Sequence, residues 1–220
     1  MLELTPHESR ILGVLIEKAF TTPNQYPLSL NALATGAGQL SNRDPVMQMT
    51  EDQAFDAVES LRQKQLAVRV DQVGSRVHKY KHLAAETLRC SQPQLAILAE
   101  LLLRGPQTLG ELRSRASRMQ PLESLDRVTE ILRGLMEIEE PLVQLLPPAP
   151  GSRAEQYTQL LSPIAHPIEP REIPASPAPA PSDGLSTRVT ALEAEVKTLH
   201  QAIQTISQAL GIPDPTQKDL

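Results

Sequence analysis

Apolar residues recur at three- and four-residue intervals in three stretches of the first 65 residues, and two short strand-like runs follow them. Each helical stretch opens on a hydroxyl side chain that can accept a hydrogen bond from the first turn, at Thr5, Ser29 and Thr50. Gly36 and Gly38 are predicted to end the second helix. The strand-like runs cover residues 66–70 and 76–83, with a turn of Asp, Gly and Ser between them. Three helices followed by a β-hairpin is the plan of a winged helix, with the hairpin as the wing.

Residues 89–162 repeat this plan. Capping residues recur at Ser91 and Thr108, a third helix is predicted from about Ser124 to Glu137, and strands are predicted at 142–146 and 154–161. Self-similarity over about eighty residues indicates two units rather than one. We therefore predict a mainly α chain with small β-hairpins, an α+β fold of two tandem winged-helix domains at 1–88 and 89–162.

The last part of the chain changes composition. Residues 163–183 are rich in Pro and Ala and are predicted to be a disordered linker, and residues 212–220 a disordered tail. Between them, residues 184–211 carry apolar side chains at alternating spacings of four and three, which predicts a parallel two-stranded coiled coil that makes the protein a homodimer. The alternative is a helix that folds back onto its own domains. The seam consists of Leu185, Val189, Leu192, Val196, Leu199, Ile203, Ile206 and Leu210.

Composition narrows the class of protein. The formal net charge is -5, which argues against a general polyanion binder, although a local basic patch can still exist. The single cysteine, Cys90, is interpreted as a structural thiol of a protein in a reducing compartment. The N-terminus has no signal-peptide pattern and no apolar run is long enough to span a bilayer, so we expect a soluble cytoplasmic protein without a membrane partner.

Several long motifs resemble a known family. Residues 21–33 (TTPNQYPLSLNAL), residues 39–47, Gly74-Ser75-Arg76-Val77 and residues 103–108 are similar to the YceH-like family of bacterial proteins. The resemblance covers about residues 4–161. It implies a tandem winged-helix fold and a family without an established biochemical activity, and it supplies no catalytic residues.

The elements predicted to contact DNA differ in the sign of their charge. The third helix of the first domain carries Glu51, Asp52, Asp56 and Glu59, which would face DNA phosphates at a cost. The first wing and its surroundings are basic instead. The candidate DNA-contacting residues are Arg43, Arg62, Lys64, Arg69, Arg76, Lys79 and Lys81. A second basic group is formed by Arg104, Arg113, Arg115 and Arg118. For each group the alternative is an ordinary solvated surface.

No pattern in the sequence indicates catalysis. The five histidines lie on unrelated elements, and only His78 and His82 have a spacing that a metal could use. We interpret this pair as ordinary polar surface residues. We expect no catalytic residue, metal or cofactor. The leading hypothesis is a protein that binds double-stranded DNA or acts in transcriptional regulation through its basic first wing. The alternative is a protein-interaction adaptor that does not bind DNA directly. A continuous basic stripe from Arg43 through Lys81 would favour the first, and an exposed apolar patch on a third helix the second.

Overall fold

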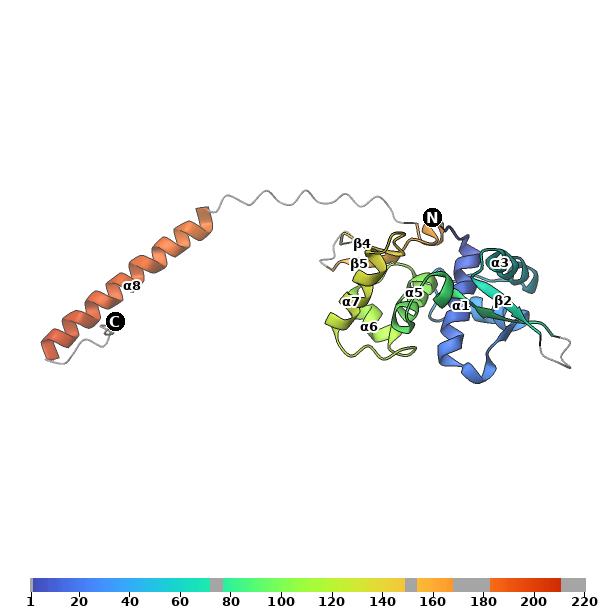
Figure 1. The fold of residues 1–220 in the computed structure, drawn as a ribbon. Helices are drawn as coiled ribbons and strands as arrows, with labels where there is room; N and C mark the ends of the chain where they lie inside the picture. Colours follow the sequence, from blue (N-terminus) through green and yellow to red (C-terminus); the bar gives the residue numbers. More distant parts are fainter. Residues whose placement is uncertain (1, 72–76, 149–153, 168–182, 211–220) are drawn as a thin grey trace. The chain divides into compact units, whose positions relative to one another are not determined.

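The computed structural model describes residues 2–71, 77–148, 154–167 and 183–210, and the side chains of the last segment from 192 to 205. The chain divides into two units, Met1–Arg171 and Glu172–Leu220. The first unit is compact and the second contains one long helix (Figure 1). The predicted disordered linker covers residues 163–183, of which 168–182 lie outside the described residues, as do the predicted tail at 212–220 and candidate Arg76. The start of that linker is ordered instead, because residues 163–165 form a short 3₁₀ helix and His166 is 9% exposed.

The first repeat has the predicted order of elements. Helix α1 (Pro6–Thr21) is followed by the short 3₁₀ helix η1 (Pro23–Gln25), strand β1 (Leu28–Ser29), α2 (Leu30–Ala37) and α3 (Glu51–Gln63). The hairpin strands are β2 (Ala67–Val70) and β3 (Lys79–His82), and the short helix α4 (Ala84–Thr87) ends the repeat. Thr5 and Thr50 form capping boxes and Ser29 caps α2, as the sequence predicts.

The second repeat has the same order. It comprises α5 (Gln92–Arg104), α6 (Leu109–Ala116), α7 (Leu125–Met136), β4 (Val143–Leu146) and β5 (Gln156–Gln159), followed by the 3₁₀ helix η2 (Pro163–Ala165). The predicted capping box at Ser91 is present, and Thr108 and Ser124 cap α6 and α7. The prediction of a mainly helical chain with small antiparallel sheets is confirmed.

The prediction that Gly36 ends α2 is wrong. The helix continues to Ala37, and Gly38 is its C-cap. Gly36 is needed for packing instead, because a Cβ there would lie 2.8 Å from Cγ1 of Val14 on α1.

Matching tyrosines organise the two hairpins. In the sheet β1-β3-β2, Tyr80 lies opposite Leu28 on one side and Arg69 on the other, and it is 1% exposed. In the second hairpin Tyr157 takes the same place, because it forms a bridge to Gln107 as Tyr80 pairs with Leu28. Because it is buried, the Tyr80 side chain packs in the core.

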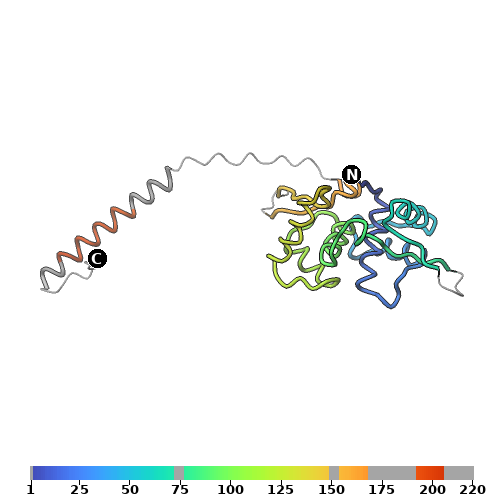
Figure 2. The backbone as a smooth tube through the Cα atoms, in the orientation of Figure 1, coloured from blue at the N-terminus to red at the C-terminus, as the bar shows by residue number. Residues whose placement is uncertain are grey.

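One hydrophobic core extends through both repeats. Helices α1 and α5 lie against each other at its centre, with the remaining elements of each repeat around them (Figures 1 and 2). Their approach is close: a Cβ on Gly13 would lie 2.9 Å from Cγ of Leu103. The backbone also joins the ends of the unit, since the Leu4 amide donates to the Leu161 carbonyl at 2.6 Å. The two repeats therefore belong to one compact unit, residues 1–171.

The second unit contains α8 (Asp183–Leu210), which confirms the predicted helix at 184–211. Where its side chains are described, the seam residues Leu192, Val196 and Leu199 are 55%, 51% and 58% exposed, and Ile203 is half-buried. The side chains of Leu185, Val189, Ile206 and Leu210 lie outside the described set. Among the described residues, no helix combines the length and the apolar character that crossing a membrane would require.

Candidate nucleic-acid interface

The outer face of the first hairpin carries two lysines. Lys79 lies opposite Val70 and Lys81 opposite Val68 in the β2–β3 register. Side chains alternate between the faces of a strand, so these four residues share the face opposite to the buried Tyr80. Lys81 is exposed and Lys79 is half-buried. Within the described residues, neither ammonium group has a hydrogen-bond or ion-pair partner, so both are available to an anion.

The other cations around this hairpin have acidic partners. Arg69 lies 3.4 Å from Asp71, which also contacts His78 at 2.7 Å. The hydrogen bond from His78, with the charge of Arg69, lowers the pKa of Asp71. Arg62 forms an ion pair with Glu59 one turn earlier on α3. Because of these exposed ion pairs, Arg69 and Arg62 are weaker phosphate ligands than unpaired cations would be, although both remain at the surface.

Lys64 is held more firmly. Its Nζ lies 2.8 Å from Oε2 of Glu8 and donates to the Glu3 carbonyl at 2.8 Å. Burial alone would raise the pKa of Glu8, but hydrogen bonds from Lys64 and Ser60 outweigh that effect and the pKa is lowered. Lys64 therefore serves mainly to stabilise a buried carboxylate.

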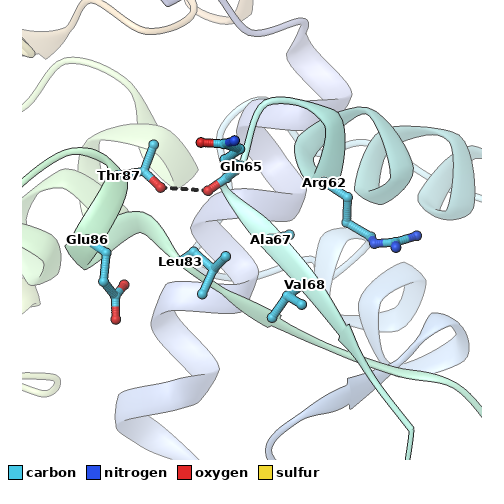
Figure 3. Close-up of a pocket in the computed structure, with 7 residues that line it drawn as sticks. All are labelled: Arg62, Gln65, Ala67, Val68, Leu83, Glu86 and Thr87. Carbon is cyan, nitrogen blue, oxygen red and sulfur yellow. Dashed lines mark hydrogen bonds between the residues drawn. The ribbon is translucent and has the colours of Figure 1, made fainter.

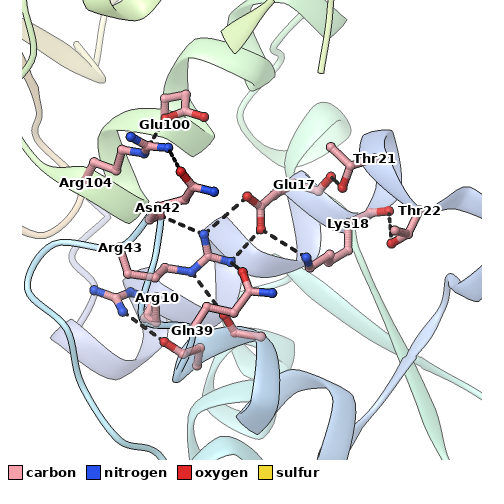
Figure 4. Close-up of polar contacts among 12 residues, drawn as sticks. Arg10, Glu17, Lys18, Thr21, Thr22, Gln39, Asn42, Arg43, Glu100 and Arg104 are labelled. Carbon is pink, nitrogen blue, oxygen red and sulfur yellow. Dashed lines mark hydrogen bonds and ion pairs between the residues drawn. The ribbon is translucent and has the colours of Figure 1, made fainter. Parts of the chain in front are cut away.

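Arg43 requires a correction, because it is 5% exposed and lies inside the fold. Its guanidinium donates to both oxygens of Glu17, at 3.2 and 2.6 Å, and to the Gly36 carbonyl at 3.0 Å (Figure 4). A DNA phosphate cannot reach it there. A continuous basic stripe from Arg43 through Lys81, which would favour DNA binding, is consequently not formed.

The second basic group is also tied into the fold. Arg118 bridges the repeats, since Nη2 lies 2.6 Å from Glu17 on α1 and 2.7 Å from Glu100 on α5. Arg104 lies 3.1 Å from Glu100 and donates to Asn42 (Figure 4). Arg115 pairs with Glu111 at 3.0 Å, and Arg113 donates to the Leu122 and Glu123 carbonyls at 3.4 and 3.1 Å. These arginines hold helices and loops together. They are therefore neither free to bind phosphates nor part of an ordinary solvated surface.

The two acids at the centre of this network are buried. The side chain of Glu17 is 2% exposed and that of Glu100 is 0% exposed. Burial alone would raise the pKa of Glu17, but Arg43 and Arg118 outweigh it and lower the pKa. Glu17, Arg43, Glu100, Arg104 and Arg118, which we call the inter-repeat ion network, fix one repeat against the other.

Helix α3 presents carboxylates and one aromatic ring. Glu51, Asp52 and Asp56 are exposed, and Glu51 accepts a hydrogen bond from Asn31 at 3.0 Å. Phe55 on the same helix is 45% exposed. This surface repels phosphates, so α3 is poorly suited to enter a DNA groove.

A groove of about 570 Å³ runs beside β2, the outer strand of its sheet. Figure 3 shows Arg62 on the α3 side of β2, and Glu86 and Thr87 on the other. The Thr87 hydroxyl donates to the Gln65 carbonyl at 2.6 Å. The groove therefore has an open strand edge and side chains of both charges around it.

The remaining titratable candidates have structural surroundings. The His82 ring lies against Tyr26, with 6.2 Å between the ring centroids, whereas His78 contacts Asp71. Burial lowers the pKa of His82 and raises that of the Cys90 thiol to about 11. No group of three or more His, Cys, Asp or Glu side chains in the described part of the chain could hold a metal ion.

Comparison with known proteins decides the family. The family model described as "Protein of unknown function, DUF480" matches residues 4–152. The chain therefore belongs to the DUF480 family. A UPF0502 protein of Pelobacter propionicus is 55% identical over 154 residues, covering 70% of each chain. UPF0502 protein GSU0233 of Geobacter sulfurreducens is 46% identical over 184 residues, 84% of this chain and 81% of its own. A UPF0502 protein of Shewanella halifaxensis is 41% identical over 202 residues, covering 87% and 92%.

Sequence reasoning missed the acids of this DUF480 chain that organise its interior. Glu100 follows Ala99 and precedes Leu101 in an otherwise apolar helix, and Glu17 ends the apolar face of α1. A carboxylate inside an apolar run needs a buried cation, and that signal could have directed attention to Arg43 and Arg118. Only the tertiary packing decides which arginine pairs with which acid.

Proposed function

We propose that this DUF480 protein is a tandem winged-helix protein that binds double-stranded DNA through the backbone phosphates and acts in transcriptional regulation, without enzymatic activity. The order of three helices and a hairpin in each repeat supports the winged-helix assignment. The observation that carries the DNA assignment is the pair Lys79 and Lys81 on the outer face of β3, where neither has an acidic partner among the described residues. Unpaired ammonium groups on a wing are what a phosphate requires.

The acidic surface of α3 limits the mode of binding. A helix with Glu51, Asp52 and Asp56 exposed would be repelled on approaching phosphates, so base reading by α3 is disfavoured. Contacts from the wing alone give few ion pairs for each chain. Binding of useful strength then requires two chains acting together.

We further propose that α8 supplies the pairing as a parallel coiled coil. Leu192, Val196 and Leu199 are each more than half exposed on the helix and repeat every seven residues with their neighbours. A facing copy would cover this seam. Deleting residues 183–220 should halve the mass in light scattering, and an unchanged mass would refute the coiled coil.

The test of DNA binding is fluorescence anisotropy of the full chain with a labelled random duplex, at about 50 and 200 mM salt. The double variant Lys79→Gln/Lys81→Gln should bind more weakly, and its plot of log K against log salt should be flatter by about 0.9 for each phosphate that the variant no longer neutralises. The matched control is Arg127→Gln/Arg133→Gln, which removes the same charge from exposed pairs on α7. Equally weakened binding in both variants, or no binding at the lower salt, would refute the wing as the site.

A second function, the protein-interaction adaptor, is favoured by the exposed Phe55. An aromatic ring on α3 between carboxylates fits a partner with an apolar pocket and basic surroundings. The open edge of β2 and its groove offer a further surface on the same repeat. If this function holds, Phe55→Ser abolishes partner binding while duplex binding is absent in wild type at the lower salt.

A further inference from the structure

A pocket of about 250 Å³ lies where the first repeat passes from α1 to α2. The second repeat joins the corresponding helices, α5 and α6, through residues 105–108 alone, whereas the first repeat uses residues 22–29 and adds η1 and β1 there. The lining residues lie between Lys18 and Gln39 and come from α1, η1, β1, α2 and the residues next to them. We call this the α1–α2 pocket, and the proposed function uses none of its residues.

Lys18 gives the pocket a positive charge that the protein does not hold tightly. Its side chain is 22% exposed, and its Nζ lies 3.8 Å from Oε2 of Glu17, which is longer than a hydrogen bond (Figure 4). That Glu17 oxygen already accepts a hydrogen bond from Arg43 at 2.6 Å. In the described part of the chain the Lys18 ammonium group makes no hydrogen bond, so its three donors are available to an anion.

The second repeat uses the cation at the matching position. Counted from the N-caps of the two helices, Arg104 on α5 is the counterpart of Lys18 on α1. The Arg104 guanidinium belongs to the inter-repeat ion network and also donates to Asn42. The two repeats therefore treat this position differently, and only the first repeat leaves its cation at the wall of a pocket.

Two side-chain amides of the pocket are oriented by the fold. The Gln39 carbonyl oxygen accepts a hydrogen bond from Arg43 at 2.9 Å, which leaves the amide N–H groups of Gln39 for a ligand. The Asn31 amide nitrogen donates to Glu51 at 3.0 Å, which leaves the Asn31 oxygen as an acceptor. The pocket therefore offers an ammonium group and an amide as donors and a second amide as an acceptor.

The charge at the pocket favours an anion. Among the described residues that line it, Lys18 is the one cation and none is acidic. Two carboxylates contact its lining residues. Glu17 is buried and is neutralised by two arginines of the inter-repeat ion network, and Glu51 is exposed, where water and salt screen its charge. A cationic ligand would meet Lys18 without a compensating acid in the wall.

The size and the apolar part of the wall indicate an organic ligand. Leu28 and Ala32 line the pocket beside its polar groups. An inorganic anion would leave these apolar side chains uncovered, whereas a short carbon skeleton would bury them. The volume is slightly below the roughly 300–1,000 Å³ of pockets for drug-sized ligands, so the ligand is smaller than those.

We infer that the α1–α2 pocket binds a small organic carboxylate that carries a hydroxyl group. The carboxylate accepts hydrogen bonds from Lys18 and Gln39, and the hydroxyl donates to the Asn31 oxygen. The carbon atoms lie against Leu28 and Ala32. One ammonium group balances the single charge of a carboxylate, whereas a phosphate ester carries nearly two charges. The inference does not rest on DNA binding, because the wing lysines are not among the lining residues.

The experiment is saturation-transfer difference NMR of the full-length protein, with 3-hydroxybutyrate as the probe. We expect a Kd of about 1 mM, which is ordinary for a ligand of so few atoms. The analogue 3-hydroxybutyramide lacks the charge and should bind about 10-fold more weakly, and butyrate lacks the hydroxyl and should bind about 3-fold more weakly. Inorganic phosphate cannot cover the apolar wall, so as a competitor it should bind about 10-fold more weakly than the probe.

Variants of the full-length protein locate the site. Lys18→Met keeps the length of the side chain, removes the charge and should weaken binding of the probe by about 10-fold or more. The matched control is Lys197→Met, which removes the same charge from an exposed position on α8 and should leave binding unchanged. Asn31→Leu should make the protein bind 3-hydroxybutyrate and butyrate equally, an effect that a general loss of stability would not produce.

Several outcomes would overturn the inference. One is the absence of saturation transfer to 3-hydroxybutyrate at about 10 mM, ten times the expected Kd. Another is equal binding of the uncharged amide, or of inorganic phosphate, because either result would show that the pocket does not select an organic carboxylate. The inference also fails if Lys18→Met, shown to be folded by its unfolding midpoint, binds the probe as wild type does. Amide chemical shifts that change at the first hairpin instead of at residues 18–39 would place the site elsewhere.

Discussion

Glu17→Gln tests whether the inter-repeat ion network stabilises the compact unit. The substitution keeps the size of the side chain and removes the charge that faces Arg43 and Arg118 at 2.6 Å each. The Arg43 side chain is 0% exposed, so its charge would stay buried without its counter-ion. Removing one partner of a buried pair costs about 3–5 kcal/mol.

We expect the lower end of that range, about 3 kcal/mol. Arg43 keeps three other acceptors, the carbonyls of Gly36 and Asn42 and the side chain of Gln39, and the Arg118 side chain is 33% exposed to solvent. For a unit of this size, the unfolding midpoint should fall by about 6–12 °C. The double variant Glu17→Gln/Arg43→Met removes both charges and should be less destabilised than the sum of the single changes.

The assay is thermal and urea unfolding, each followed by tyrosine fluorescence. The chain has no Trp, and its Tyr residues, Tyr26, Tyr80 and Tyr157, all lie in residues 1–171, so the signal reports this unit without α8. The control is Glu59→Gln, which breaks the half-exposed pair with Arg62 and should cost about 1 kcal/mol or less. If Glu17→Gln is no more destabilising than this control, the network does not contribute as argued.

Two further predictions concern acid and close packing. The pKa values of Glu8 and Glu17 are lowered in the folded unit, so the free energy of unfolding should be constant above the ordinary pKa of 4.5 and fall as pH drops through it towards the folded values. Urea titrations between about pH 6 and 3 measure this, and Glu17→Gln should flatten the decline; a decline equally steep in the variant would contradict the assignment. Gly110→Ala on α6, where a Cβ meets nothing within 4 Å, should stabilise the unit by about 0.5–1 kcal/mol. Gly13→Ala places a Cβ 2.9 Å from Leu103, so its free energy of unfolding should be about 1–3 kcal/mol lower than that of Gly110→Ala. Equal effects of the two substitutions would show that the α1–α5 contact adjusts to the added methyl group without cost.

The parts of the fold that sequence reasoning predicted depend on neighbouring residues. Capping boxes at Thr5, Thr50 and Ser91 join groups three residues apart, and hairpin strands alternate within four residues. Each of these signals involves only residues that are close together in the sequence. The assignment of Gly36 as a helix stop failed because its neighbour is Val14, which belongs to another helix.

The candidate interface was predictable only in part for the same reason. Arg43 and Glu17 are 26 residues apart, and Arg118 and Glu17 are 101 apart. Nothing local to Arg43 distinguishes it from Lys81, yet one cation is buried and the other is exposed. Counting charges along a segment therefore overestimates a basic surface, because pairing and burial decide which charges a ligand can reach.

The two repeats can be compared position by position, since the same order of elements is present twice in one chain. Tyr80 and Tyr157 occupy equivalent places, so Lys79 and Lys81 correspond to Gln156 and Thr158, which carry no charge. The second hairpin thus forms without lysines at these two positions, where Gln156 is half-buried and Thr158 is 1% exposed, and the loop at 117–124 buries its large apolar side chains. The first repeat differs in both respects, because it carries the two lysines and its loop at 38–50 exposes Leu40. The second repeat holds that repeat in place through Arg118 and His166, so its contribution is to fix the surfaces that the first repeat presents.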